Sequence, residues 1–327
     1  MSTAELDLCL SAMERAGVDA LVLGREANAR AISGANRLWL AGTRAFAPGC
    51  VVVRRERSVH LLANSDAGFE GFPRANLYPI TWNAERLLAS LHAIPGFTDA
   101  RTIGVDGMSC GMHALFQVWV PDAQLVDAEP VIAELWAFHS PQQLRGVQQA
   151  ALVACSGLGA MAAFLRDGVR ARVLRGVCAE RFASFGVTTP AFEAVAAPID
   201  GGASTWLPPE RLLADGESVA LRAGVLRDGW EASLARTYVV GEPSVEQPPP
   251  PGWDAVFALC RPNTSVGQLR DLEAVVYGVG RGVEPYDDTV KLEAGMVCAL
   301  ELQHGQRLHQ DVLHITADLP EVLTTVF

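Results

Sequence analysis

Apolar residues in the first third of the chain alternate between helical and strand spacing. Helical spacing, with a stop at Gly17 after the first segment, occurs over residues 4–16 and 84–93. Short apolar strand patterns occur over residues 19–23, 47–53, 58–64 and 102–106. The charged turn RRER separates the second and third of these strands, which predicts a hairpin. Together these elements predict an α/β domain over residues 1–130.

The remainder of the chain begins with helical patterns and then changes to strands. An Ala-rich amphipathic pattern over residues 134–168 passes through His139-Ser140-Pro141, where Ser140 can cap a helix and Pro141 can occupy its first turn. A further helix is predicted over residues 171–185, and strands over residues 192–197, 218–223, 235–240, 296–302 and 310–316. The prolines of the run EQPPPPGW at residues 246–253 have no backbone N–H to donate to a sheet, so this run is interpreted as a surface polyproline spacer. We expect a second domain over residues 131–327.

Composition excludes several classes of protein. The chain has 327 residues, of which 50% are hydrophobic, so it can bury one large core or two ordinary ones. Its formal net charge of -11 and its single lysine, Lys291, argue against nucleic-acid or anionic membrane partners, because both require clustered cations. The seven cysteines stand singly, which fits neither a disulfide framework nor a zinc site. With no secretory start pattern, a cytoplasmic protein is expected.

Two common catalytic motifs are absent from the sequence. It contains no HExxH pair and no phosphate-binding loop of the GxxxxGK[ST] type. His304, His309 and His314 cluster around the last predicted hairpin. By strand alternation His314 shares the face of Gln310 whereas His309 points away, and both are interpreted as surface or rim residues.

Several segments resemble the creatinase, aminopeptidase P and methionine aminopeptidase ("pita-bread") family. In the first domain they are AGVDALVLGREANARAISG, with Asn28 and Gly34, then IGVD at residues 103–106 and LVDA at residues 125–128. In the second domain they are GESVALRAG at residues 216–224, RTYVVGEP at residues 236–243, GVGRGVEP at residues 278–285 and LEAGM at residues 292–296, continuing to Glu301. The resemblance implies a two-domain α/β (α+β) protein. Its C-terminal half would be a curved, mainly antiparallel sheet backed by helices, in a homodimer.

The same resemblance points to five positions where the family has metal ligands. Where the family pattern has Asp, Asp, His, Glu and Glu, this chain has Arg222, Ser233, Tyr277, Glu301 and Gln310. A further family histidine corresponds to Thr205, next to Trp206. Two divalent ions held close together need several carboxylates, often with a histidine, and a guanidinium would repel them. The sequence therefore predicts no metal site and no cofactor.

The remodelled pocket leaves alternatives open for each candidate residue. Arg222 either neutralises Glu301 as a structural pair or orients a substrate carboxylate. Tyr277 either donates a proton or an oxyanion hydrogen bond, or packs as an ordinary aromatic. Glu301 is the leading catalytic candidate, because a carboxylate within an apolar strand must be paired or act as an acid or base. The predicted substrate-binding residues are Gln310, Ser233, Trp206, Arg281 and Glu284.

Two functions are compatible with these residues. One is a metal-independent hydrolase or lyase, not an Xaa-Pro peptidase, that acts by general acid/base chemistry near a C–N bond of a small amino-acid-like or amide substrate. Creatinase, which works without a metal, is the precedent that the resemblance supplies. The other is a catalytically inactive, peptidase-like binding or scaffolding protein. A pocket closed by an Arg222–Glu301 pair would favour the second function, and an enclosed polar pocket with an unpaired carboxylate the first.

Overall fold

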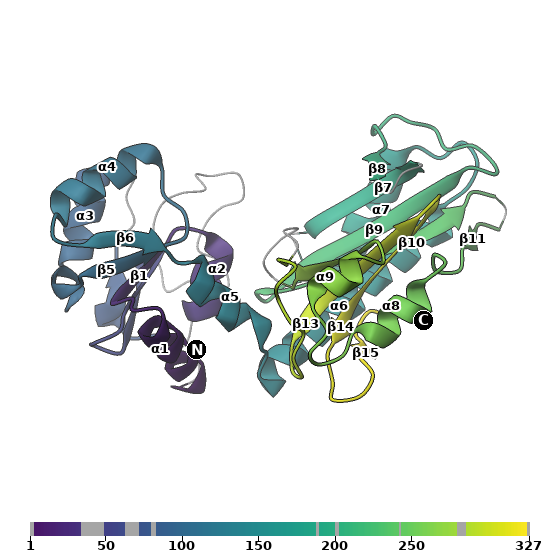
Figure 1. Cartoon of the computed structure of the whole chain (residues 1–327). Helices are drawn as coiled ribbons and strands as arrows, with labels where there is room; N and C mark the ends of the chain where they lie inside the picture. Colours follow the sequence, from purple (N-terminus) through teal and green to yellow (C-terminus); the bar gives the residue numbers. More distant parts are fainter. Residues whose placement is uncertain are drawn as a thin grey trace. The chain divides into compact units, whose positions relative to one another are not determined.

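The computed structural model describes residues 3–33, 49–62, 72–79, 83–187, 190–199, 203–241, 243–279 and 286–325. The chain divides into two compact units, Met1–Trp136 and Ala137–Phe327 (Figure 1). This division lies a few residues after the boundary expected near residue 130. Of the candidate site residues, Arg281 and Glu284 lie outside the described residues.

The described part of the first unit is a six-stranded sheet with helices on both faces. Its strand order is β4-β3-β2-β1-β5-β6, with β1 antiparallel to β2 and parallel to β5. The strands are β1 Ala20–Leu23, β2 Cys50–Val53, β3 Ser58–Leu62, β4 Leu77–Tyr78, β5 Thr102–Val105 and β6 Gln124–Asp127. Helices α1 (Thr3–Arg15), α2 (Glu26–Ser33) and α5 (Glu129–Ala137) cover one face. Helices α3 (Ala84–His92) and α4 (Cys110–Trp119) cover the other.

A buried carboxylate holds the turn between β1 and α2. Asp106, directly after β5, accepts hydrogen bonds from the backbone N–H of Gly24 at 2.6 Å and from Nδ2 of Asn28 at 2.8 Å. The Oδ1 atom of Asn28 in turn accepts from the indole N–H of Trp136 at 3.1 Å. These bonds join three elements at one edge of the sheet, which gives Asn28 a structural role.

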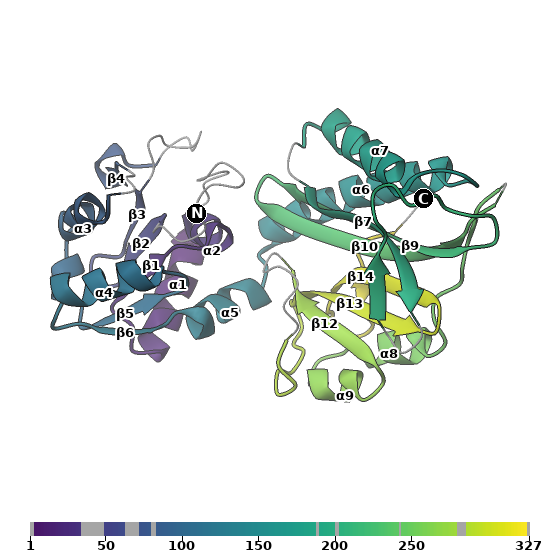
Figure 2. The ribbon, with the colours of Figure 1, turned by 90° about the horizontal axis from the view of Figure 1, so that it is seen from above.

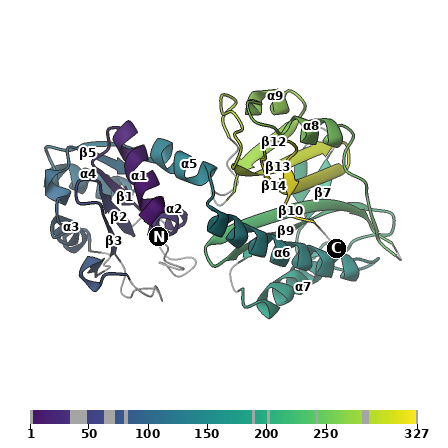
Figure 3. The same ribbon diagram turned by 90° about the horizontal axis from the view of Figure 1, so that it is seen from below.

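The second unit contains a long antiparallel sheet (Figure 2). Its strand order is β12-β13-β14-β10-β9-β7-β8, with β11 paired to β10 and β15 to β14. The strands are β7 Pro190–Ile199, β8 Ala203–Trp206, β9 Ser218–Arg227, β10 Trp230–Val239, β11 Val245–Glu246, β12 Ala274–Gly278, β13 Val297–His304, β14 Arg307–His314 and β15 Glu321–Val322. Helices α6 (Pro141–Phe164) and α7 (Ala171–Ser184) lie beside β9 and β10, whereas α8 (Trp253–Leu259) and α9 (Val266–Arg270) lie beside β12 to β14 (Figure 3). The predicted architecture, a small α/β domain followed by a domain with a mainly antiparallel sheet backed by helices, is confirmed.

The helix start predicted at Ser140 and Pro141 is confirmed. The amphipathic pattern over residues 134–168 forms α5 and α6, which are interrupted between Ala137 and Pro141. Proline lacks an N–H donor and disfavours helical backbone at the residue before it, so α5 cannot continue into α6. Ser140 instead caps α6: its Oγ accepts from the Gln143 N–H at 3.3 Å, and Gln143 Oε1 accepts from the Ser140 N–H at 2.7 Å. Helix α4 and strands β4, β6, β8 and β12 were not predicted as elements.

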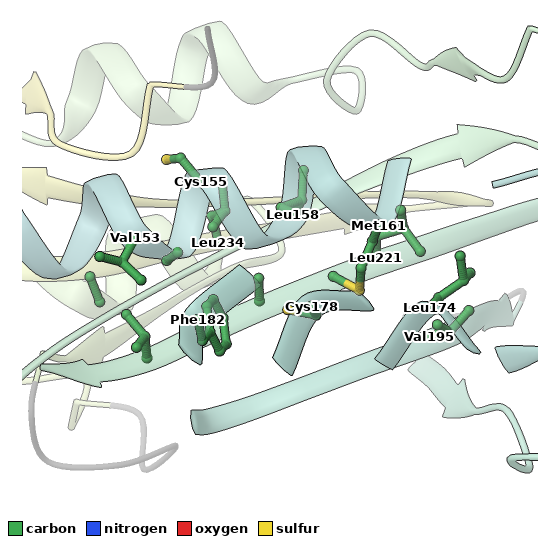
Figure 4. Packing of buried hydrophobic residues seen from close by; sticks show 14 of the residues in the cluster. Val153, Cys155, Leu158, Met161, Leu174, Cys178, Phe182, Val195, Leu221 and Leu234 are labelled. Atoms are coloured by element: carbon green, nitrogen blue, oxygen red, sulfur yellow. The ribbon is translucent and has the colours of Figure 1, made fainter. Parts of the chain in front are cut away.

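Helix α6 is the centre of the second unit's core. Its residues Val153, Leu158 and Met161 pack with α7 and with the sheet, where Leu221 and Leu234 meet them (Figure 4). Gly157 lets α7 approach closely, because a Cβ at this position would overlap the ring of Phe182. Among the described residues α6 alone has the length and apolar character of a membrane span, but half of that stretch is buried inside the unit. Burial of this kind is that of a core helix.

Candidate functional site

Strand register brings the candidate side chains to one face of the second unit's sheet. Arg222 on β9 pairs with Ala235 on β10, Ala235 pairs with Gln310 on β14, and Gln310 pairs with Glu301 on β13. Directly paired residues of antiparallel strands point to the same face. These four residues therefore form a row across four neighbouring strands.

Two further candidates, Ser233 and Tyr277, point to the same face of the sheet. Each is aligned with a position two residues along a strand from a member of the row. Ser233 precedes Ala235 on β10 by two positions. Tyr277 on β12 pairs with Ala299, which precedes Glu301 by two positions. Since side chains alternate along a strand, Ser233 and Tyr277 point to the same side as the row.

Hydrogen bonds connect the five polar side chains. Nη2 of Arg222 donates to Oε2 of Glu301 in an ion pair and to Oε1 of Gln310 at 3.2 Å. The amide Nε2 of Gln310 donates to Oγ of Ser233 at 3.0 Å. The hydroxyl of Tyr277 donates to the Glu301 carboxylate. The Arg222–Glu301 pair is largely buried, with side-chain exposures of 17% and 14%.

Burial changes the acidity of two of these groups. Burial raises the pKa of Glu301 above its ordinary value, although the Arg222 charge and the hydrogen bonds from Arg222 and Tyr277 oppose the change. Burial and the nearby Glu301 carboxylate raise the pKa of Tyr277 to about 12. Tyr277 therefore keeps its proton at neutral pH and acts as a hydrogen-bond donor.

A pocket of about 220 Å³ opens beside this network. Its described lining is Trp206, Arg222, Glu231, Ala232, Ser233, Tyr277, Gly278, Val279, Ala299, Gln310 and Val312. Predicted residues Trp206, Arg222, Ser233, Tyr277 and Gln310 are thus brought together at the pocket. Glu301 bonds to two of them without being part of the lining itself.

Sequence reasoning missed Glu231, which also lines the pocket. Glu231 lies two positions before Ser233 on β10, so it faces the same side of the sheet. The signal in the sequence was the two-residue spacing from Ser233, because side chains two positions apart on a strand point to the same face.

A second polar cluster lies on the opposite face of the sheet. Nη2 of Arg236 donates to Oδ1 of Asp311 at 2.6 Å, and His309 Nε2 contacts Oδ2 of the same carboxylate at 2.9 Å. Thr324, near the C-terminus, donates to Asp311 at 2.7 Å. Asp311 points away from Gln310, its neighbour on β14, as strand alternation requires. The interpretation of His309 as a surface or rim residue is wrong, because His309 is 7% exposed and packs against the ring of Trp253.

The donor set at the pocket does not fit a pair of divalent ions. Such ions need several carboxylates or imidazoles, whereas the Arg222 side chain reaches across this row and its guanidinium bonds to Glu301 and Gln310. Ser233, Tyr277 and Gln310 supply neutral groups. Across the described part of the chain, His, Cys, Asp and Glu side chains form no group of three that could hold a metal ion.

Comparisons with known proteins agree with this architecture. The model of the Creatinase/Prolidase N-terminal domain matches residues 6–135, and that of Metallopeptidase family M24 matches residues 145–272. The chain is similar to the protein described as "Uncharacterized peptidase YqhT" of Bacillus subtilis (strain 168), with 23% identity over 143 residues. That match covers 42% of this chain and 40% of the relative's length.

Solved structures are similar over nearly the whole chain. The prolidase from Pyrococcus horikoshii OT3 has a TM-score of 0.78 and 16% identity, with 99% of each chain covered. The Xaa-Pro dipeptidase from Bacillus anthracis has a TM-score of 0.71 and 15% identity, covering 98% of this chain and 97% of its own. At these identities the similarity establishes the fold. With both domain models matched in order along the chain, this protein belongs to the creatinase and aminopeptidase P (pita-bread) family.

Proposed function

We propose that the second unit binds a small amino-acid-like or amide substrate and acts on it without a metal ion, by general acid/base chemistry next to a C–N bond. One observation carries the proposal. The buried carboxylate of Glu301 is held between the Arg222 guanidinium and the Tyr277 hydroxyl, beside a pocket that can admit a small molecule. Buried titratable groups with shifted pKa values at a pocket are typical of catalytic acids and bases.

Each polar group has a defined chemical role in this proposal. Glu301 accepts or returns one proton at the nitrogen or at an attacking water, and its raised pKa brings it closer to the working pH. Tyr277, protonated at neutral pH, donates to the substrate oxygen on which negative charge develops. Because Ser233 Oγ accepts from Gln310, its own hydroxyl hydrogen can donate into the pocket.

A second candidate function is a catalytically inactive, peptidase-like binding or scaffolding protein. The observation that favours it is the Arg222–Glu301 ion pair itself, because a carboxylate already bonded to a guanidinium is less available as a base. In this alternative the same residues shape a binding pocket but transfer no proton.

Metal dependence is the first test. We expect purified protein to contain no stoichiometric manganese, cobalt, zinc or iron by elemental analysis. Added manganese or cobalt should leave the melting temperature unchanged, whereas a ligand present at a hundred times its Kd stabilises a folded protein by about 2.7 kcal/mol. Cleavage of Xaa-Pro dipeptides that appears with these metals and disappears with a chelator would overturn the proposal.

Turnover is the second test and separates the two functions. Wild-type protein and Glu301→Gln are incubated with a panel of small amides and amino-acid derivatives in the presence of a chelator, and the products are followed by mass spectrometry. If the protein is an enzyme, the wild type should convert at least one compound and Glu301→Gln should not. Circular dichroism checks that the variant is folded. Compounds that bind to both proteins without conversion would support the inactive alternative.

We further propose that the protein acts as a homodimer in the cytoplasm, without nucleic-acid or membrane partners. The net charge of -11 supports the absence of polyanionic partners. Light scattering coupled to size-exclusion chromatography measures the mass of the assembly. A mass equal to one chain, 34.9 kDa, would contradict the homodimer.

A further inference from the structure

The run of prolines at residues 248–251 has no part in the proposed chemistry. It joins β11 (Val245–Glu246) to α8 (Trp253–Leu259) in the second unit (Figure 1). Pro248, Pro249 and Pro251 are exposed, and Pro250 is buried. The run therefore presents apolar rings to solvent.

Burial along this segment repeats every three residues. Ser244 and Gln247 are partly buried and Pro250 and Trp253 are buried, whereas the residues between them are exposed. An α-helix or a strand would bury residues with a period of about 3.6 or about 2 instead. A polyproline II helix has about three residues per turn, so one edge can lie against a protein while two edges face solvent. The prolines therefore have the burial pattern of a polyproline II helix.

The two exposed edges of this helix are largely apolar. One edge carries Val245, Pro248 and Pro251, and the next carries Glu246 and Pro249. The side chain of Val245 is also accessible, because this residue is 55% exposed. Pro248 and Pro251 have the PxxP spacing that is recognised by domains with a groove lined by aromatic side chains. The exposed edges thus have the form of a ligand for such a groove.

Hydrogen bonds hold both ends of the proline run. Before the first proline, the N–H of Gln247 donates to the carbonyl oxygen of Thr237 on β10 at 2.8 Å. After the last, the N–H of Trp253 donates to the carbonyl oxygen of Pro250 at 3.1 Å, and the indole ring packs against His309. A partner therefore meets a segment that is already ordered, and binding costs little conformational entropy.

Acidic residues flank the prolines. The sequence has no Lys or Arg between Arg236 and Arg261, whereas Glu246 precedes the run and Asp254 follows it. Both acidic residues are exposed, and Glu246 also accepts a hydrogen bond from the Tyr238 hydroxyl at 3.2 Å. Like charges that face each other across an interface are costly, so a groove bordered by Lys or Arg fits this segment better than one bordered by acidic residues.

We propose that residues 245–251 are a docking site for a protein domain whose groove is lined by aromatic side chains and bordered by basic residues. Aromatic rings of the groove pack against the proline rings of the two exposed edges. The side chains that contact Glu246, Tyr238 and Arg236, point to the face of β10 opposite to Ala235 and the pocket. This docking site is therefore separate from the pocket and does not rest on the proposed function.

Purified proline-binding domains test the inference on the whole chain. The probes are WW and EVH1 domains with Lys or Arg beside the aromatic groove. An SH3 domain with acidic residues beside its groove is the comparison. By titration calorimetry at low salt, at least one WW or EVH1 domain should bind about tenfold more tightly than the SH3 domain, a difference of about 1.4 kcal/mol.

Variants assign the binding to the proline run. The double variant Pro248→Ala with Pro251→Ala removes two rings from one exposed edge and should weaken binding about tenfold. Pro249→Ala on the other exposed edge should weaken it about threefold. Pro209→Ala, in the exposed pair Pro208-Pro209, is the matched control and should leave binding unchanged. Circular dichroism checks that each variant is folded.

A change in the probe tests the same contact without any change in this chain. Replacing the groove tryptophan or tyrosine of the bound domain by alanine should abolish binding, even if a proline variant folds poorly. The inference is overturned if no probe domain binds, if binding survives loss of the groove aromatic, or if the proline variants bind as tightly as the control. Lower melting temperatures of the proline variants without binding of any domain would leave the run as a stiff spacer.

Discussion

Arg222 and Glu301 form an ion pair although two strands, β14 and β10, lie between their own strands in the sheet. Three strand spacings of about 4.8 Å separate their backbones. The long guanidinium side chain can cross this distance because Ala235, fully buried in the same row, presents only a methyl group. Gln310, the other residue between them, also accepts a hydrogen bond from Arg222.

Removing one partner of this pair should destabilise the protein more than removing both. Arg222→Met leaves Glu301 buried without its cation, which typically costs about 3 to 5 kcal/mol. The double variant Arg222→Met with Glu301→Gln should recover much of the loss, because no charge remains buried. Urea unfolding of wild type, both single variants and the double variant measures the coupling. Equal stabilities for all four proteins would show that the pair contributes nothing.

Asp311 should matter more for stability than any exposed aspartate. Burial alone would raise its pKa, but the hydrogen bonds from His309 and the charge of Arg236 hold the pKa below its ordinary value. Asp311→Asn should therefore lower the free energy of unfolding by about 3 kcal/mol, because Arg236 loses its buried partner. Asp318→Asn, an exposed residue after the same strand, should change it by less than about 0.5 kcal/mol. A loss no larger than that of the control would contradict this reading.

Two glycines of α6 should respond oppositely to alanine. Gly157→Ala places a methyl group against Phe182, and such overpacking typically costs about 1 to 3 kcal/mol. A Cβ added at Gly159 would meet no neighbouring atom within 4 Å. The better helix propensity of alanine should therefore make Gly159→Ala more stable than wild type by up to about 1 kcal/mol. Thermal unfolding of the two variants compares them directly. Equal shifts would mean that α6 and α7 are not packed through Gly157.

His60 should make the first unit sensitive to acid. Burial lowers its pKa from 6.5 to about 4, and its Nδ1 is buried without a hydrogen-bond partner. The unfolded chain therefore binds a proton at His60 at a higher pH than the folded one. The contribution of neutral, buried His60 to the free energy of unfolding is complete above pH 6.5 and declines as the pH falls towards 4. The total decline is about 1.4 kcal/mol for each unit by which the folded and unfolded pKa values of His60 differ.

The variant His60→Gln isolates that contribution, because glutamine does not titrate. Its free energy of unfolding should fall less steeply than that of wild type between pH 6.5 and about 4. Urea unfolding at a series of pH values measures both slopes. Parallel curves for the two proteins would assign the acid sensitivity to other groups, such as His139, whose pKa burial also lowers to about 4.

Local patterns in the sequence determined the architecture and part of the site. The succession of helical and strand spacing along the chain indicated two domains. The cap of α6 at Ser140 and the opposite orientations of Gln310 and Asp311 follow from helix capping chemistry and strand alternation, which involve only neighbouring residues. The resemblance to the family supplied Arg222, Ser233, Tyr277 and Gln310, and the structure brings these residues together. The amphipathic pattern by itself did not show that the helix is interrupted before Pro141. Hydrophobic spacing does not depend on whether a residue has a backbone N–H, which proline lacks.

Only the tertiary structure decided which side chains meet. The bond from Arg222 to Glu301 spans 79 residues of sequence and that from Arg236 to Asp311 spans 75, so both depend on the register of strands that are remote in the chain. The burial of His309 against Trp253 and the position of Glu231 at the pocket depend on the same register. A one-residue change of register would turn every side chain of a strand to the other face, and the pairing across the whole sheet is what selects one register.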